Sequence, residues 1–128
     1  MPAEPSSLRA LEVAESLRDM GPVEIKRFFG GASLGLAGVQ FAFVMKGTLY
    51  LRADEGTRKE FEDLGSRPFS YATRAGRVTV ASYYETPADV MDDATALRTW
   101  AAQAHRAALQ ARPKAGGRRA AGRSESVA

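Results

Sequence analysis

The chain of 128 residues contains no cysteine and a single histidine, His105. Without cysteine it has no disulfide framework, no thiolate zinc site and no cysteine nucleophile, so packing alone must hold the fold. A lone histidine makes a poor metal site, and no serine or acid is arranged around His105 as in a catalytic triad. We expect His105 to lie at the edge of a helix interface. The sequence therefore predicts no catalytic residue, no metal, no cofactor and no enzymatic activity.

Charge is absent from residues 28–45, a stretch of 18 positions, which is long enough for a membrane span to be considered. Four glycines, Ser33 and Gln40 dilute this run, and its apolar residues alternate with the period of a sheet rather than of a spanning helix. Charged residues also interrupt the first 19 positions, where a signal peptide would need an unbroken apolar stretch. We therefore expect no membrane contact and a cytoplasmic protein.

Residues 26–52 are predicted to form a strand meander. Two turn signals, Ala37-Gly38 and Lys46-Gly47, divide it into three apolar-rich strands, and each glycine can take the positive φ that a tight hairpin needs. The middle strand alternates with a period of two. Its predicted faces are Val39, Phe41, Phe43 and Met45 on one side, and Gln40, Ala42 and Val44 on the other.

Helices are predicted from start and stop signals. An N-terminal helix ends at Gly21-Pro22, and Asp54 caps a short middle helix. Thr86 is the expected cap of another short helix, which ends near Met91. A last helix runs over residues 94–111 and carries an apolar stripe, with Trp100 expected to anchor it to the sheet.

A second hairpin, made of residues 69–73 and 78–84, completes the predicted sheet. The predicted fold class is α+β: an antiparallel sheet of about five strands in two hairpin or meander units, with an N-terminal helix, a short middle helix and a C-terminal helix packed on it. With 45% hydrophobic and 26% charged residues, the chain closes one core. We expect a flexible N-terminus at 1–7, one domain at 8–110 and a disordered basic tail at 111–128.

The net charge of +3 comes from the tail. Residues 1–110 hold 13 Lys or Arg and 14 Asp or Glu, whereas 111–128 hold five basic residues and one acid. The tail has three glycines and no large apolar residue, so it cannot bury a face. Flexible cations contact phosphates without reading bases, which predicts either nonspecific nucleic-acid contact or a solubilising terminus. These cations are Arg112, Lys114, Arg118, Arg119 and Arg123.

Aromatic and basic residues of the predicted strands form a candidate interaction surface. They can stack bases or a planar ligand, or form a homodimer interface, although tyrosines are also ordinary strand residues whose rings pack across from one another. The residues considered for one sheet surface are Tyr50, Tyr71, Tyr83, Tyr84, Arg52, Arg74 and Arg77. Those assigned to the interaction surface are Lys26, Arg27, Phe29, Tyr71, Arg74, Arg77 and Tyr83.

Other patterns that resemble binding sites have structural explanations. Phe29-Gly30-Gly31 can form an anion nest, but it lacks the spacing of a phosphate loop or a dinucleotide fingerprint. A bulge or a close backbone approach explains these glycines better, with Phe28 or Phe29 in the core. Asp92-Asp93 lies where a helix cap is expected, and Glu60, Glu62 and Asp63 are assigned to the exposed side of the middle helix.

Four motifs occur in a specific order. They are the basic-aromatic-Gly-Gly turn at 26–31, Gly-Thr-Leu-Tyr-Leu-Arg at 47–52, Pro68-Phe69-Ser70-Tyr71, and Ser82-Tyr83-Tyr84-Glu85 followed by Pro87. In this order and spacing the chain resembles the N-terminal domain of the TfoX/Sxy family over roughly residues 8–109. The resemblance implies a compact α+β domain in a family named for bacterial regulators of natural competence. Full-length regulators of this type carry a C-terminal domain, so the resemblance is to a stand-alone N-terminal domain.

Two functions remain open from the sequence. The first is a small regulatory or adaptor domain that binds a protein partner through its sheet or helix face, with nonspecific nucleic-acid contact through the tail. The second is a small-ligand binding module with a pocket between the sheet and the C-terminal helix. An exposed apolar patch favours the first, and an enclosed pocket with converging polar groups favours the second.

Overall fold

The computed structural model describes residues 5–111, so the expectations for residues 1–4 and for the basic tail at 112–128 lie outside the described residues. The helices are α1 (Pro5–Ser16), the 3-10 helix η1 (Arg18–Met20), α2 (Glu55–Asp63), α3 (Ala88–Met91) and α4 (Ala94–Ala111). The strands are β1 (Glu24–Phe28), β2 (Gly31–Leu36), β3 (Val39–Met45), β4 (Thr48–Arg52), β5 (Pro68–Thr73) and β6 (Gly76–Glu85). The α1 helix begins within the seven residues that were expected to precede the domain.

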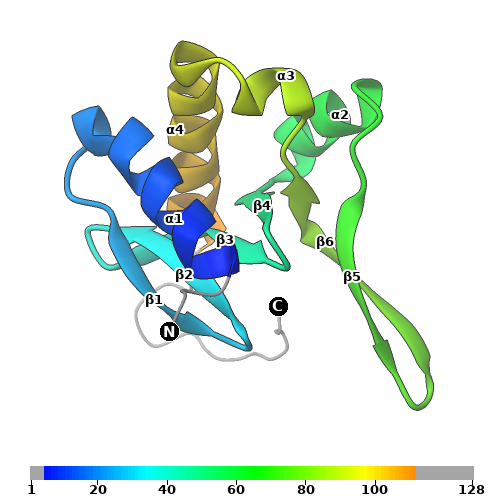
Figure 1. Cartoon of the computed structure of the whole chain (residues 1–128). Helices are drawn as coiled ribbons and strands as arrows, with labels where there is room; N and C mark the ends of the chain where they lie inside the picture. The colour runs from blue at the N-terminus through cyan, green and yellow to red at the C-terminus, as the bar shows by residue number, and fades with distance from the viewer. Residues whose placement is uncertain (1–4, 112–128) are drawn as a thin grey trace, which may run out of the picture.

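The strands form one antiparallel sheet in the order β1-β2-β3-β4-β6-β5, which confirms the α+β class. The sheet has six strands rather than about five, because a turn at Phe29-Gly30 divides the first segment of the meander into β1 and β2. Helices α1 and α4 lie side by side against one face of the sheet (Figure 1). The described helices leave most of the opposite face open, and we call it the open face.

The three turns of the meander share the backbone geometry of type I′ hairpins, with positive φ at both central residues. The pairs are Phe29-Gly30 (46° and 85°), Ala37-Gly38 (55° and 81°) and Lys46-Gly47 (53° and 82°). The last two are the turns predicted from the sequence. Phe29 is the unusual member, because a bulky aromatic residue rarely adopts the left-handed region. The turn holds this ring at the tip of the β1–β2 hairpin.

A β-bulge in β3 overturns the alternation predicted for that strand. The register shifts between Leu34 and Gly35 of β2, which leaves Phe41 as an extra residue of β3. Phe41 and Ala42 therefore both lie in the core beneath the helices, whereas Phe43 lies among the rings of the open face. The predicted single face of large apolar residues is wrong, because the bulge divides those residues between the two sides of the sheet.

The core fills the space between the sheet and the two long helices. The predicted α4 stripe is buried there, at Leu97, Ala101, Ala104 and Ala108. Trp100, expected to anchor α4 to the sheet, packs against this core. Its ring meets the Phe61 ring of α2 edge-to-face at 4.9 Å, and Phe61 stacks on Tyr84 of β6. The Tyr84 hydroxyl donates to the Glu62 carboxylate at 2.6 Å. Burial and this carboxylate raise the pKa of Tyr84 to about 12.

Two aspartates cap helices as predicted. Asp54 Oδ1 accepts from the Thr57 N–H at 2.8 Å, and the Thr57 hydroxyl accepts from the Asp54 N–H at 3.0 Å, which makes a capping box for α2. Hydrogen bonds to the Asp54 carboxylate, above all the one from the Thr57 N–H and then the one from the Thr57 hydroxyl, lower the pKa of Asp54. Asp93 Oδ1 accepts from the backbone N–H groups of Thr95 and Ala96 at the start of α4.

Thr86 has a structural role that differs from the predicted one. Its hydroxyl donates to the carbonyl oxygen of Leu49 in β4 at 3.0 Å, and its backbone N–H donates to the same oxygen at 2.9 Å. Pro87 takes the N-cap position of α3, with no side-chain cap hydrogen bond. The predicted cap is wrong, because this buried hydroxyl finds its partner at the end of β4.

Strand β5 and the first half of β6 form a two-stranded arm that projects from the body of the sheet (Figure 1). Phe69 pairs with Val80, but the adjacent Pro68 pairs with Tyr84. The three residues of β6 between these two pairs have no register partner on β5. In this region β6 leaves β5 and begins to pair with β4. Residues 71–79 are exposed on both faces of the ribbon. Because a lone hairpin is marginally stable in water, the arm depends on packing at its base.

Candidate functional site: an aromatic groove on the open face

An aromatic cluster occupies the open face. Phe43 is at its centre and is only 2% exposed. Its ring centroid lies 4.8 Å from that of Tyr83, 4.9 Å from those of Phe28 and Phe69, and 5.2 Å from that of Tyr50. Phe28 comes from β1 and Phe69 from β5, which are the two edge strands of the sheet. Side chains from both edge strands reach the same ring only if the sheet curves toward that side. The open face is therefore concave.

The concave face holds a groove of about 1320 Å³. Ala108 and Ala111, at the C-terminal end of α4, reach one end of it. Rings from two hairpins and from the middle of the sheet form its floor and walls. The aromatic residues that line the groove are Phe28, Phe29, Phe43, Tyr50, Phe69, Tyr71 and Tyr83.

Neighbouring residues act on two of the phenol groups that line the groove, those of Tyr50 and Tyr83. Burial raises the pKa of Tyr50 above its ordinary value of 10.0; the charge of Glu85 raises it further, and that of Arg67 opposes the shift. The Tyr83 hydroxyl accepts a hydrogen bond from Gln40 Nε2 at 3.2 Å. The Tyr83 hydroxyl is therefore held by a hydrogen bond inside a mainly apolar lining.

Positive charge in the groove is not compensated by an acid of its lining. The described lining residues include Lys46, Arg52 and Arg77 and no Asp or Glu. Arg77 Nε donates to Ser70 Oγ at 2.9 Å, and the Arg52 guanidinium carbon lies 5.4 Å from the centre of the Tyr83 ring. Within residues 5–111, none of these three cations forms an ion pair.

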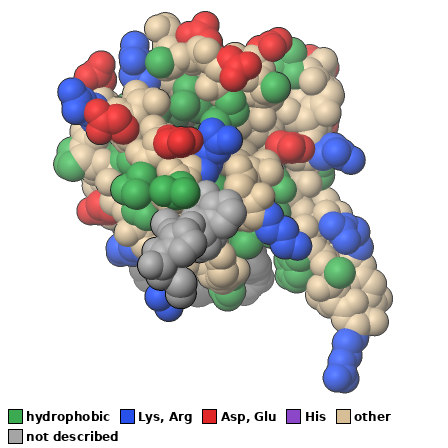
Figure 2. Space-filling model, viewed as in Figure 1, with side chains coloured by type: hydrophobic (Ala, Val, Ile, Leu, Met, Phe, Trp, Pro, Cys, Tyr) green, Lys and Arg blue, Asp and Glu red, His purple; other side chains and the backbone are tan. Residues whose placement is uncertain are grey.

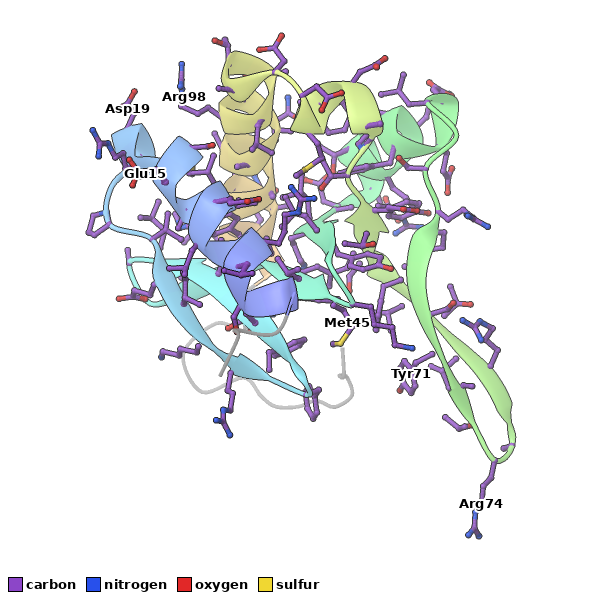
Figure 3. The ribbon with its side chains drawn as sticks, in the orientation of Figure 1. Glu15, Asp19, Met45, Tyr71, Arg74 and Arg98 are labelled. Atoms are coloured by element: carbon purple, nitrogen blue, oxygen red, sulfur yellow. The ribbon has the colours of Figure 1, made fainter. Side chains whose placement is uncertain are left out.

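Two exposed aromatic residues from different hairpins border the groove. Phe29, at the tip of the β1–β2 hairpin, is 87% exposed, and Tyr71, on the arm, is 43% exposed. Figure 3 shows Tyr71 on the side of the arm that faces the body of the sheet, with Met45 across from it, whereas Arg74 points away at the tip of the arm. Exposed aromatic rings beside a concave apolar surface are typical of interaction sites.

The structure brings together four of the seven residues predicted for the interaction surface. Phe29, Tyr71, Arg77 and Tyr83 all line the groove. Lys26 lines a smaller hollow of about 220 Å³ that shares Gln40 with the groove. Arg27 is exposed on β1 and Arg74 lies at the tip of the arm, and neither lines the groove. Tyr84, considered for the same surface, lies on the opposite face against Phe61.

Sequence reasoning missed the floor of the groove. Phe43 was placed on the same face as Phe41, and Phe69 was treated only as a strand residue. The sequence does contain one signal for this floor, the alternation of β4. Leu49 and Leu51 face the core, so Tyr50 and its even-numbered neighbours face the groove. The position of Phe43 required the bulge, which the sequence does not mark.

Residues considered for other kinds of site have structural roles instead. His105 Nε2 lies 3.1 Å from the carbonyl oxygen of Leu36, which can only accept, so this nitrogen donates; the ring edge packs on Phe41. A close backbone approach explains Gly31, as predicted, because a Cβ there would overlap the carbonyl oxygen of Val44. Within the described part of the chain, no group of three His, Asp or Glu side chains is placed to hold a metal ion.

The projecting arm carries charged side chains of one sign. Figure 2 shows Lys and Arg, and no Asp or Glu, on the projecting arm, while acidic side chains gather around α3 and the start of α4 at the top of the view. The sequence of the arm agrees, because Arg74 and Arg77 are the only charged residues of 68–84. The arm side of the groove is therefore basic.

The fold is that of a small α+β domain with an aromatic groove on the open face of its sheet. The chain belongs to the TfoX N-terminal domain family, whose model matches residues 15–108. Among curated proteins, none matches the chain. No helix within residues 5–111 is both long enough and apolar enough to cross a membrane.

Proposed function

We propose that this domain is a small, non-enzymatic regulatory or adaptor module of the cytoplasm that acts by binding a protein partner through the aromatic groove. The observation that carries the proposal is the combination of an open groove of about 1320 Å³ with a bordering Phe29 that is 87% exposed. Aromatic anchors beside a concave surface dominate the binding energy of many protein interfaces. The position of the domain in a family named for competence regulators is consistent with a regulatory role.

The geometry favours this function over a small-ligand module. The pocket of that alternative would lie between the sheet and α4, and this space is filled by buried side chains such as Phe41, Leu97 and Ala101. The groove on the other face is partly open to solvent and bordered by exposed rings from two hairpins. An extended protein segment fits such a surface better than a compact small molecule, which is usually enclosed.

The composition of the groove supports a binding role rather than a catalytic one. Its described lining contains no carboxylate and no imidazole that could act as a general base. Its hydroxyl groups on Ser70 and Tyr83 are engaged with Arg77 and Gln40. These groups orient side chains at the surface, which is what a recognition site requires.

Replacement of the two bordering rings tests the proposal. We expect the double variant Phe29→Asn, Tyr71→Ser to lose a partner that the full chain retains from an extract of its own organism, with affinity for the purified partner falling roughly 30-fold or more, as for interface anchors. Asparagine tolerates the left-handed backbone of position 29, and both side chains are exposed, so stability should change by less than about 1 kcal/mol.

The matched control is Leu64→Ser, which removes a 58% exposed apolar side chain at the end of α2, away from the groove. A protein that binds the native chain and this control equally, but not the groove variant, supports the proposal. If every retained protein binds the groove variant as tightly as the native chain, the groove is not the interface. Sedimentation of the purified chain separately reveals whether the partner is a second copy.

The basic tail adds a second, electrostatic contact in this proposal, to nucleic acid. We expect a short DNA duplex to bind the full chain weakly, with log K falling against log salt at a slope of roughly −4 to −5 for five phosphate contacts. Replacement of Arg112, Lys114, Arg118, Arg119 and Arg123 by Gln should abolish this binding in fluorescence anisotropy. Salt-tolerant binding by the neutralised chain would instead place the nucleic-acid contact on the folded domain.

A further inference from the structure

We propose that the partner segment bound by the groove is an extended, acidic peptide in which carboxylates flank an apolar or aromatic side chain. This inference rests on the proposed function and adds the chemistry of the partner. It follows from the charge of the groove lining, from the positions of its guanidinium groups and from the charge of the rest of the domain.

The lining carries three cations and no acid, and none of the three is neutralised by an ion pair within the described chain. Two acids lie near the groove without lining it: Glu85 acts on the Tyr50 hydroxyl, and Glu24 lines the smaller hollow that shares Gln40 with the groove. Uncompensated positive charge in an apolar groove disfavours a basic or neutral partner and attracts an anionic one. Carboxylates of the bound segment would complete these pairs.

Two guanidinium groups are held in place before a partner arrives. The bond from Arg77 Nε to Ser70 orients one of them on the arm. The other, on Arg52, stands over the Tyr83 ring, and its buried Nε has no hydrogen-bond partner among residues 5–111. Oriented guanidinium groups bind carboxylates through paired N–H donors, and a preordered site loses less side-chain entropy on binding.

The apolar part of the partner is assigned to the space between Phe29 and Tyr71. Phe29 is held out into solvent by a left-handed backbone at φ 46°, which an aromatic residue rarely adopts. Tyr71 faces the body of the sheet from the arm (Figure 3). A side chain bound between these rings would cover apolar area that the free domain leaves exposed.

A short acidic segment fits this domain better than a long polyanion. Residues 1–110 carry a net charge of −1, so a nucleic acid that extends beyond the groove meets a surface with more acids than cations. At physiological salt, charges act over about 8 Å, so a peptide confined to the groove feels mainly its three cations. In addition, Phe43 and Tyr83 are 2% and 7% exposed, with faces covered by other rings rather than open for base stacking.

Selection of short peptides from a random display library on the full chain tests the inference. We expect the selected peptides to be enriched in Asp and Glu on either side of an aromatic or large aliphatic residue, and to be lost on the Phe29→Asn, Tyr71→Ser variant. For the best peptide, Glu→Gln replacement should weaken binding by about tenfold or more, as for charge-assisted hydrogen bonds. Arg52→Gln and Arg77→Gln should each weaken it similarly, whereas Arg106→Gln, an exposed cation of α4 outside the groove, should not.

The outcomes separate the inference from the function on which it rests. Peptides that need the groove but carry no excess of acids, or that tolerate Arg52→Gln and Arg77→Gln, overturn the acidic partner and leave the protein-binding function standing. Selection that yields no groove-dependent peptide overturns both. Tight, salt-tolerant binding of a short single-stranded oligothymidylate that is lost in the groove variant would assign the groove to nucleic acid instead.

Discussion

Gly31→Ala is expected to destabilise the domain by about 3 kcal/mol or more, at the upper end of the usual cost of overpacking. The reason is steric, since a Cβ at this position would overlap the Val44 carbonyl oxygen and lie 3.2 Å from the carbonyl carbon and 3.3 Å from the Met45 sulfur. The overlapped atom is backbone of the neighbouring β3, so no side-chain rotamer can relieve the contact. Strands β2 and β3 would have to separate at this end of their ladder. Urea unfolding followed by circular dichroism measures the change.

Gly30→Ala is the matched control because it alters the adjacent residue of the same turn. Gly30 has φ +85° but no atom within 4 Å of the added Cβ, so its replacement tests the left-handed backbone alone. That cost is about 1–2 kcal/mol. A Gly31→Ala variant no less stable than Gly30→Ala would contradict the close approach of β2 and β3 shown by the structure.

The turns of the sheet could be predicted from the sequence because their cause is local. Ala37-Gly38 and Lys46-Gly47 each place a glycine where a two-residue hairpin needs positive φ, and both turns form as predicted. A turn at 26–31 was recognised as a motif, but the two-residue hairpin at Phe29-Gly30 was not predicted, because its first position holds a bulky aromatic residue that disfavours that backbone. The extra strand of the sheet follows from this one turn.

The bulge at Phe41 could not be predicted, because its cause lies in the packing of distant elements. Residues 39–45 alternate well enough for a regular strand, and only the contacts of Phe41 with His105 of α4 and of Phe43 with the open face show the change of side. A one-residue slip moves every following side chain to the other face of a sheet. The floor of the candidate site therefore depends on a feature that exists only in the folded chain.

Residue type predicted some members of the candidate site, and the topology of the folded sheet brings these residues together. Tyr71, Tyr83 and Arg77 were assigned to one surface because aromatic and basic residues on strands suggest recognition, and the structure places them in one groove. Tyr84 was considered with them, although the period of two separates adjacent residues of a strand, and it lies on the helical face. The curvature that brings side chains of both edge strands to Phe43 depends on the whole sheet, so no local sequence pattern predicts it.

The dependence of the groove on Phe43 leads to the second large expected effect. Phe43→Ala should lower the free energy of unfolding by about 3–5 kcal/mol, through lost burial and the cavity left behind. It should also free the arm, because the ring of Phe43 contacts Phe69 at the base of β5 and Phe28 on the opposite edge strand. We therefore expect amide hydrogen exchange in residues 69–80 to rise beyond what the loss of global stability alone produces.

Phe61→Ala separates these two effects, because Phe61 is equally buried, at 2% exposure, but lies on the helical face against Tyr84 and Trp100. It should cost a similar amount of global stability by the same mechanism. Its effect on exchange in residues 69–80 should follow the global change only. Equal exchange in the arms of the two variants would show that Phe43 does not hold the arm to the sheet. Faster exchange in the Phe43 variant would mean that one ring supports both the global stability of the domain and the attachment of the arm to the sheet.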